Sequence, residues 1–258
     1  MRRTKPASGR CAEFPYNRRM KARLHVAAGL APGALIELPA AAAHHALRVL
    51  RLGEGDAVTL FNGTGGQWQA SLLKQGRVRI EGFEAIERES PLEVTLLQCL
   101  PAADKMDFIV HKGVELGVSA IVPVISRRSV VRLSGERMAR RVQHWQAVAV
   151  AACEQCGRNR VPKVAGLVEL PAALTAVSRA GGTRYLLSPQ ADQSLRLLAA
   201  PEEPLTLLVG PEGGFDEAEL QAARRAGFTA VRLGPRVLRT ETAGLAALAA
   251  IQTLWGDF

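Results

Sequence analysis

Over the first part of the chain, hydrophobic and polar positions alternate in short runs that are separated by glycine-rich turns. Such runs predict short β-strands, and their spacing is typical of a small barrel or a compact sheet. The segment NGTGG at 62–66 is the strongest turn signal. One helical insertion is expected at 44–52. The predicted strands are 24–26, 34–38, 57–61, 67–73 and 77–86.

The pattern changes near Ser90 and Pro91. Beyond this point, apolar runs alternate with segments of helical periodicity, which predicts an α/β domain with a mainly parallel sheet. The chain is therefore expected to hold two domains, at 22–90 and 91–258. In the second domain, strands are expected at 92–100, 120–125 and 185–188, and helices at 105–116 and 136–156.

Two further apolar runs near the C-terminus each end in a Gly-Pro step that leads into a helix-like stretch. They read LTLLVGPEGGF at 205–215 and LGPRVLRTETA at 233–243. Parallel strands bring their carboxyl ends to one sheet edge, where open α/β sheets bind ligands, so the two loops are expected to form one site. Taken singly, the first loop is equally well a plain strand-to-helix turn and the second a polar helix cap.

The first loop carries the features of a ligand site. Gly210, Gly213 and Gly214 have no Cβ and let a ligand lie directly against the backbone. Glu212 adds a charge that a plain turn does not need. In the second loop, Arg239 and a following TET segment place a cation, a carboxylate and two hydroxyls in front of a helix.

Two helices follow these loops. Asp216 and Glu219 resemble a capping box, which predicts that the first helix begins at Glu217. The second, at 243–255, reads AGLAALAAIQTLW and is too hydrophobic for a helix with one side in water. It is expected to be covered nearly all round, either in the core of a monomer or at an interface between subunits.

Several classes of protein are not indicated. Neither G-x-G-x-x-G after the first strand nor G-x-x-x-x-G-K-[ST] occurs, which argues against a dinucleotide-binding Rossmann enzyme and a P-loop enzyme. No uncharged apolar stretch reaches membrane-spanning length and no secretory signal is recognised, so we expect a cytoplasmic protein. Cys153 and Cys156 form a lone C-x-x-C. This spacing is found both in redox pairs and in one half of a zinc site. We expect ordinary thiols and no metal.

The net charge of +9 is unevenly distributed. Residues 1–23 contain eight Lys and Arg against one Glu, so a basic leader at 1–21, which we expect to be disordered, supplies most of the charge. Met20 could be the true start. Residues 127–163 contain nine basic residues against two acidic ones, and this segment is the better candidate for contact with a phosphate backbone. The alternative is a helix with a solvated basic face.

Five segments in order carry a resemblance to a known family. They are LRVLRLGEGD at 47–56, KGVELGVSAIVPVISRRS at 112–129, EQCGRNRVP at 154–162, LLVGPEGGF at 207–215 and LGPRVLRTETA at 233–243. With them the chain resembles the SPOUT superfamily of S-adenosylmethionine-dependent RNA methyltransferases. Within that superfamily it is similar to the bacterial RsmE family, which methylates N3 of a uridine in 16S ribosomal RNA. Cys156 departs from the family pattern, in which a small polar residue is usual.

The resemblance implies a fold and partners. The implied fold is a small PUA-like β-barrel that binds RNA, followed by an α/β SPOUT domain whose parallel sheet carries a C-terminal trefoil knot. General rules make knots very rare, so only the resemblance supports this one. The implied partners are 16S rRNA or the small ribosomal subunit, and a second copy of the chain in a homodimer with the last helix at or under the interface. Neither a membrane nor a metal is implied.

The resemblance also implies site residues and S-adenosylmethionine as the cofactor. Arg239 is expected to stabilise the uracil anion, and Glu241 to act as base or to orient that arginine, although it could instead cap its own helix. The implied cofactor-binding residues are Leu187, Ser188, Gly210, Glu212, Gly213, Leu233, Gly234, Val237 and Leu238. The implied RNA-binding residues are Arg48, Arg51, Arg127, Arg128, Arg158, Asn159 and Arg160.

Two alternative functions remain open at this point. One is a SPOUT methyltransferase with another acceptor, such as a ribose 2′-hydroxyl, because the knot loops alone do not select the acceptor atom. The other is a non-catalytic RNA-binding factor for ribosome assembly.

Overall fold

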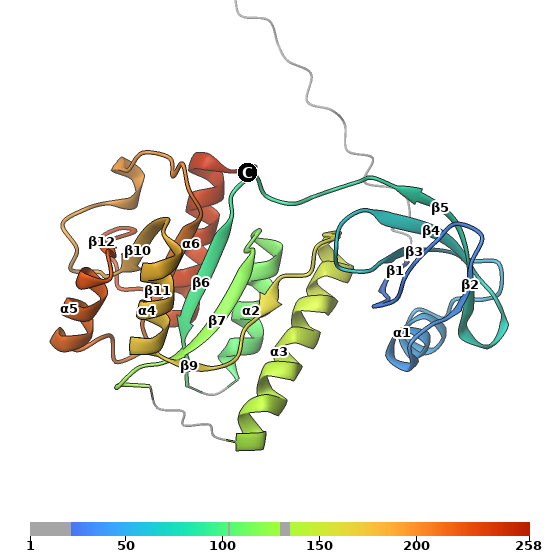
Figure 1. The fold of residues 1–258 in the computed structure, drawn as a ribbon, viewed down its shortest axis with the longest axis horizontal. Helices are drawn as coiled ribbons and strands as arrows, with labels where there is room; N and C mark the ends of the chain where they lie inside the picture. The colour runs from blue at the N-terminus through green and yellow to red at the C-terminus, as the bar shows by residue number, and fades with distance from the viewer. Residues whose placement is uncertain (1–21, 103, 130–134) are drawn as a thin grey trace, which may run out of the picture.

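The computed structural model describes residues 22–102, 104–129 and 135–258. The predicted basic leader at 1–21 lies outside the described residues. Figure 1 shows a small β-domain joined by a short linker to a larger domain in which helices cover a central sheet. Among the described residues, no helix combines the length and the apolar character needed to cross a membrane.

The first domain is a five-stranded sheet in the order β1-β3-β4-β5-β2. β1 runs parallel to β3, and the other neighbouring pairs are antiparallel. Inward-facing residues such as Leu24, Leu60, Leu72 and Ile80 are fully or almost fully buried and form its core. The strands are β1 (Ala22–His25), β2 (Leu35–Glu37), β3 (Ala57–Phe61), β4 (Gln67–Leu72) and β5 (Arg77–Glu84). All five sequence-predicted strands are confirmed.

The helical insertion of this domain begins earlier than its sequence indicates. α1 (Ala40–His44) continues into a π-helix, His45–Val49. The exposed Arg51, just after it, has φ +55°, a left-handed conformation that is rare outside glycine. Arg48 and Arg51 are both exposed, and α1, which leads into this turn, lies on the right in Figure 1.

The second domain contains a parallel sheet in the order β12-β10-β11-β6-β7-β8, with β9 also pairing with β7. The strands of this sheet are β6 (Val94–Cys99), β7 (Ala120–Ile125), β8 (Lys163–Val164), β9 (Val168–Glu169), β10 (Thr183–Leu187), β11 (Leu205–Val209) and β12 (Thr229–Val231). The mainly parallel α/β sheet predicted from the sequence is confirmed.

Helices cover both faces of this sheet. α2 (Lys105–Glu115), α3 (Gly135–Cys156) and α6 (Thr240–Trp255) share one buried cluster with Leu96 and Leu207. α4 (Leu170–Ala180) and α5 (Glu217–Arg225) pack on the other face against Leu97 and Leu208. α2 contacts both α3 and α6, so the last helix lies beside the helix that follows the first strand of the domain.

The chain crosses between loops to reach α6. Leaving β12, Arg232 donates from its backbone N–H to Gln193 O at 2.9 Å, and Leu195 N–H donates to Arg232 O at 3.0 Å. Thr240 Oγ then donates to Gly210 O at the end of β11. The last segment thus passes the loop after β10 and changes to the opposite face of the sheet from α5.

A polar network fastens the two domains together. Arg23 of β1 donates to Asn159 Oδ1 at 2.6 Å, and the backbone N–H of His25 donates to Glu154 of α3 at 2.9 Å. Glu89 of the linker holds the buried Arg158 at 2.6 Å. Because these contacts come from a strand, the linker and the end of α3, they fix the small domain against the large one.

Candidate active site

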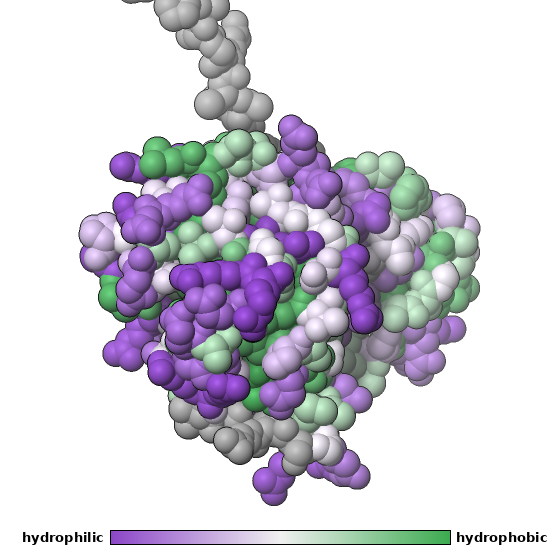
Figure 2. Space-filling view, turned by 60° about the vertical axis from the view of Figure 1, so that its left-hand side comes forward, coloured by the Kyte–Doolittle hydropathy of each residue, from purple (hydrophilic) through white to green (hydrophobic). Residues whose placement is uncertain are grey.

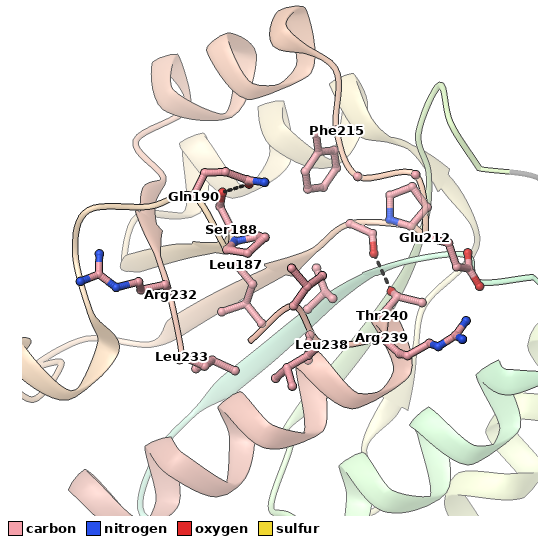
Figure 3. A pocket seen from close by; sticks show the side chains of 18 of the residues that line it. Leu187, Ser188, Gln190, Glu212, Phe215, Arg232, Leu233, Leu238, Arg239 and Thr240 are labelled. Carbon is pink, nitrogen blue, oxygen red and sulfur yellow. Dashed lines mark hydrogen bonds between the residues drawn. The ribbon is translucent and has the colours of Figure 1, made fainter. Parts of the chain in front are cut away.

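A pocket of about 480 Å³ opens at the carboxyl ends of β10, β11 and β12. Three segments form it: the loop after β10, the glycine loop (210–215) after β11, and the arginine loop (232–239) that leads from β12 to α6 (Figure 3). The implied cofactor residues all line this one pocket, namely Leu187, Ser188, Gly210, Glu212, Gly213, Leu233, Gly234, Val237 and Leu238.

The glycine loop is closely packed against the side chains of Phe215 and Arg128. A Cβ on Gly210 would lie 3.0 Å from the ring of Phe215, and a Cβ on Gly213 would lie 3.3 Å from Cβ of Arg128. Arg128 also donates from Nη1 to Gly213 O at 2.8 Å. Gly214 has φ +65°, which favours glycine. The sequence of the loop therefore brings bare backbone to the pocket wall.

The arginine loop offers unused backbone groups. Within the described part of the chain, no protein hydrogen bond involves the backbone of residues 233–238. Backbone N–H and C=O groups require partners, so here water or a ligand must supply them. Leu187 at the end of β10 and Leu233 and Leu238 of the arginine loop lie around the same cavity (Figure 3), whereas Val237 is 79% exposed. A planar apolar ligand whose edge forms hydrogen bonds fits this arrangement.

The helix after the glycine loop begins as predicted. Asp216 accepts from Glu219 N–H at 2.8 Å and Glu219 accepts from Asp216 N–H at 3.0 Å, which confirms the capping box. The bond from Glu219 N–H, with the nearby Arg127 guanidinium, lowers the pKa of the Asp216 carboxyl. Glu219 Oε1 also accepts from the backbone N–H of Arg127 at 2.8 Å. The cap therefore holds both the end of the glycine loop and the segment after β7.

Of the two candidate catalytic residues, Arg239 lines the pocket and Glu241 does not, and neither a hydrogen bond nor an ion pair joins them. Arg239 is exposed, and none of the described residues forms a hydrogen bond or an ion pair with its guanidinium. Glu241 pairs instead with Lys105 Nζ at 3.2 Å. The suggestion that Glu241 orients Arg239 is therefore wrong. Glu241 does lie in the first turn of α6, where a carboxylate is favoured by the helix dipole, although no side-chain hydrogen bond is made at the N-cap residue itself.

Glu212 is also held by Lys105. Its carboxylate accepts from the backbone N–H of Ala102 at 3.0 Å and from Lys105 Nζ at 3.1 Å. Burial alone would raise the pKa of the Glu212 carboxyl, but these bonds and one from its own backbone bring the pKa below its usual value. Figure 3 shows Glu212 at the same end of the pocket as Arg239. The carboxylate that Glu212 adds to the glycine loop is thus paired with Lys105.

The RNA-binding residues suggested by the sequence fall into separate groups. Arg127 and Arg128 are exposed, and Arg128 lines the pocket itself. Arg160 is exposed and lies 3.4 Å from Glu87 at the domain junction. Arg48 and Arg51 belong to the small domain, whereas the pocket lies in the large one. On the side shown in Figure 2, a strip of apolar surface is exposed between groups of hydrophilic side chains.

The interpretation of Arg158 and Asn159 as RNA ligands is wrong. Both residues are buried, with exposed fractions of 6% and 0%. Arg158 binds Glu89 and donates to Val114 O and Val118 O at 2.9 and 2.8 Å, so its donors are occupied inside the protein. Asn159 accepts from Arg23 and donates to Ile86 O. A charged group that is enclosed and paired in this way cannot reach a phosphate.

The cysteines carry no sign of special chemistry. Cys99, Cys153 and Cys156 are free, and burial raises the pKa of Cys99 and of Cys153 to about 12. Such thiols stay protonated and unreactive at neutral pH. Among residues 22–102, 104–129 and 135–258, no group of three or more His, Cys, Asp or Glu side chains is arranged to hold a metal ion.

Several site residues were missed by the sequence analysis. Gln190 and Phe215 line the pocket, and both lie within or beside segments that the sequence had already singled out. Thr240 links the start of α6 to Gln98 Nε2 at 3.0 Å and to the glycine loop. Lys105 was read only as the start of a helix, and no local motif identifies it.

Comparison with known proteins agrees with this architecture. Residues 88–252 match the RNA methyltransferase domain family, and residues 38–81 match the RNA methyltransferase PUA domain family. Fold and site together therefore define an RNA methyltransferase with a PUA domain. Among curated proteins, the chain is 31% identical to ribosomal RNA small subunit methyltransferase E of Buchnera aphidicola over 83% of this chain and 86% of that one. It is 32% identical to the Bacillus subtilis protein of that name over 81% and 86%.

A solved structure gives the same result. Ribosomal RNA small subunit methyltransferase E from Neisseria gonorrhoeae, crystallised with S-adenosylmethionine, is 44% identical, with a TM-score of 0.87 over 92% of this chain and 99% of that one. The chain belongs to the ribosomal RNA small subunit methyltransferase E family.

Proposed function

We propose that this protein transfers a methyl group from S-adenosylmethionine to N3 of a uridine in 16S ribosomal RNA. The observation that carries the proposal is the pocket of bare backbone at 210–215 and 233–238, with the unpaired cation Arg239 at its edge. The small-subunit RNA named for the relatives, and the cofactor bound to one of them, support it.

The residues present fit the cofactor. A volume of about 480 Å³ is in the range of small-molecule sites, which is roughly 300–1,000 Å³. Leu233, Val237 and Leu238 would contact the adenine, and the unused backbone groups of the arginine loop would bind its edge. Leu187, Ser188 and the glycine loop would hold the rest of the nucleoside. When bound, S-adenosylmethionine supplies an electrophilic methyl group on its sulfonium.

Methylation at N3 requires that the negative charge on the uracil ring be stabilised. N3 of uracil carries an imide proton, and its loss leaves a negative charge shared with O2 and O4. Arg239 stabilises that charge, since its guanidinium has no partner among the described residues. Glu241 takes the proton, since its carboxylate is held by Lys105 at 3.2 Å in the first turn of α6, two residues after Arg239.

The RNA is held at two places, one on each domain. Arg127 and Arg128 at the pocket bind phosphates next to the target uridine, which must be unstacked to expose N3. Arg160 adds a contact at the domain junction. Arg48 and Arg51 bind the same RNA on the small domain, where Leu47, Val49 and Leu50 are also exposed. A substrate that reaches both places is a folded RNA rather than a short single strand.

The protein acts as a homodimer. α6 buries one side, including Gly244, Leu248 and Ile251, but leaves Leu254 44% exposed. Phe108 of the neighbouring α2 is 51% exposed. These residues extend the apolar surface of the two helices into solvent, and a second copy would cover it. Leu254→Glu is expected to give monomers in analytical ultracentrifugation, and a variant that sediments like the wild type would contradict this interface.

Nucleoside mass spectrometry tests the acceptor atom. 16S rRNA from cells that lack the protein is compared with 16S rRNA from the same cells with the gene restored. The proposal expects 3-methyluridine to be absent and then to return. Loss of a ribose-methylated nucleoside instead would identify another acceptor. Calorimetry with S-adenosylmethionine tests the cofactor, and no binding would favour a non-catalytic assembly factor.

A further inference from the structure

Lys105 lies where three parts of the site meet. It is the first residue of α2, and its ammonium reaches Glu212 Oε1 of the glycine loop at 3.1 Å and Glu241 Oε1 of α6 at 3.2 Å. The segment before α2 adds a further bond, from Ala102 N–H to Glu212 at 3.0 Å. One side chain thus ties the N-terminus of α2 to both chain segments that flank the pocket.

The charges at this point require a cation. Glu212 and Glu241 share Lys105, so their carboxylates are near neighbours, and two like charges in one place disfavour each other's ionisation. Lys105 is 30% exposed and its partners 28% and 20%, so solvent screens the three charges only in part. Other cations nearby are engaged elsewhere: Arg141 of α3 pairs with Asp104 at 3.1 Å.

Arg239 is the alternative partner of these carboxylates. It immediately precedes α6, two residues before Glu241, and it lies at the same end of the pocket as Glu212 (Figure 3). With Lys105 in place, both carboxylates are bound to one cation, and among the described residues Arg239 remains unpaired. Without Lys105, Arg239 would be drawn to the carboxylates and away from the substrate.

We propose that Lys105 is a positioning residue of the methyl-transfer site, which fixes the carboxylate of Glu241 and keeps Arg239 free by holding both Glu212 and Glu241. The inference rests on the proposed function, because it assigns Lys105 to the same reaction. Lys105 touches neither the acceptor base nor the backbone that binds the cofactor. It acts through the two carboxylates.

The test compares Lys105→Met with Lys112→Met. Lys112 lies on the same helix and pairs only with Glu115, at 2.7 Å, away from the pocket. Methylation of 16S rRNA is measured as a function of pH. Lys105→Met is expected to lower kcat roughly a hundredfold, as misplacement of a reacting group does. The acidic limb of its pH profile should move up, because the carboxylates that Lys105 binds lose an opposite charge.

A second measurement is independent of turnover. Hydrogen exchange of the free protein should become faster in 210–216 and 238–243 in Lys105→Met and stay unchanged in Lys112→Met. Lys105→Arg keeps the charge and should keep the wild-type pH limb. If Lys105→Met does not fold, Lys105→Gln replaces it, since glutamine donates a hydrogen bond without a charge.

The outcomes separate the two proposals. A wild-type protein that neither binds S-adenosylmethionine nor methylates 16S rRNA refutes the proposed function. A wild-type protein that methylates, together with a Lys105→Met variant whose pH limb and exchange match those of Lys112→Met, refutes the role of Lys105. A lower kcat with an unmoved pH limb also refutes it, because the loss would then come from structure alone.

Discussion

Two basic segments of the catalytic domain, Arg127–Arg128 and Arg158–Asn159, show how differently the same residue types can be used. The first pair follows β7 and stays exposed beside the pocket, where Arg128 holds Gly213 O. The second pair follows α3 and is enclosed at the domain junction, where Arg158 binds Glu89 at 2.6 Å. The difference lies in the arginines: the side chain of Arg158 is 7% exposed and that of Arg127 is 69% exposed, whereas their carboxylate partners Glu89 and Asp216 are both largely covered, at 17% and 24%.

The largest effect is expected from Arg158→Met. This change leaves Glu89 buried without its cation and removes the donors to Val114 O and Val118 O. Breaking a buried pair from one side costs about 3–5 kcal/mol of unfolding free energy. Urea denaturation measures this, with Arg160→Met as the control, since the exposed Arg160 pair should contribute less than about 1 kcal/mol. Equal losses in both variants would remove the distinction between the two segments.

Gly213→Val tests the role of the exposed segment Arg127–Arg128 at the pocket, because Arg128 holds the glycine loop through Gly213 O. A Val side chain would press on Arg128, whose Cβ lies 3.3 Å from the position of a Cβ on Gly213, and would enter the pocket wall. We expect the Kd for S-adenosylmethionine to rise at least about a hundredfold, or roughly 2.7 kcal/mol, with the melting temperature little changed. Calorimetry and thermal denaturation measure the two quantities. Wild-type affinity would show that the glycine loop is not the cofactor wall.

Replacing Arg127 and Arg128 by Ala should mainly affect RNA binding. Each phosphate contact releases about one counterion, so the slope of log K against log salt should flatten by up to about 2 units. Arg48→Ala with Arg51→Ala should produce a similar change on the small domain. Filter binding of a 16S rRNA fragment at several salt concentrations measures the slope. An unchanged slope in the first variant would exclude the pocket rim as a phosphate-binding surface.

The smallest effect concerns Asp216, which links Arg127 to the helix cap. Its folded pKa lies below the unfolded value, mainly because Glu219 N–H donates to it. Its contribution to stability is therefore fully present above the unfolded pKa of about 4 and is lost as the pH falls through the folded pKa. Asp216→Asn keeps a cap acceptor but cannot titrate, so it should slightly reduce the decline in stability below pH 4. Denaturation curves from pH 3 to pH 7 measure this difference.

Local pattern identified most of the fold. Alternation and glycine turns located the five strands of the first domain, and the Gly-Pro loops after β11 and before α6 located the pocket. The elements that the sequence analysis missed are short or lack a turn signal at their boundary. β8 and β9 have two residues each, too few to show a period, and α4 begins directly after β9 with Pro171 in its first turn.

Pairing over long sequence distances could not be inferred from one sequence. Counting charges along the chain suggested that Arg158 and Arg127 are alike, but the partner of Arg158 is 69 residues away. Lys105 lies 107 and 136 residues from Glu212 and Glu241. Only the folded sheet edge brings these groups together, so their roles depend on tertiary structure rather than on any motif.

The fastened junction between the domains has a consequence for target selection. Since Arg23, His25 and Glu89 lock the small domain to the end of α3, the spacing between Arg51 and Arg239 is constant. On the proposed function, this fixed spacing would restrict methylation to uridines whose surrounding RNA offers a second phosphate cluster at the matching distance.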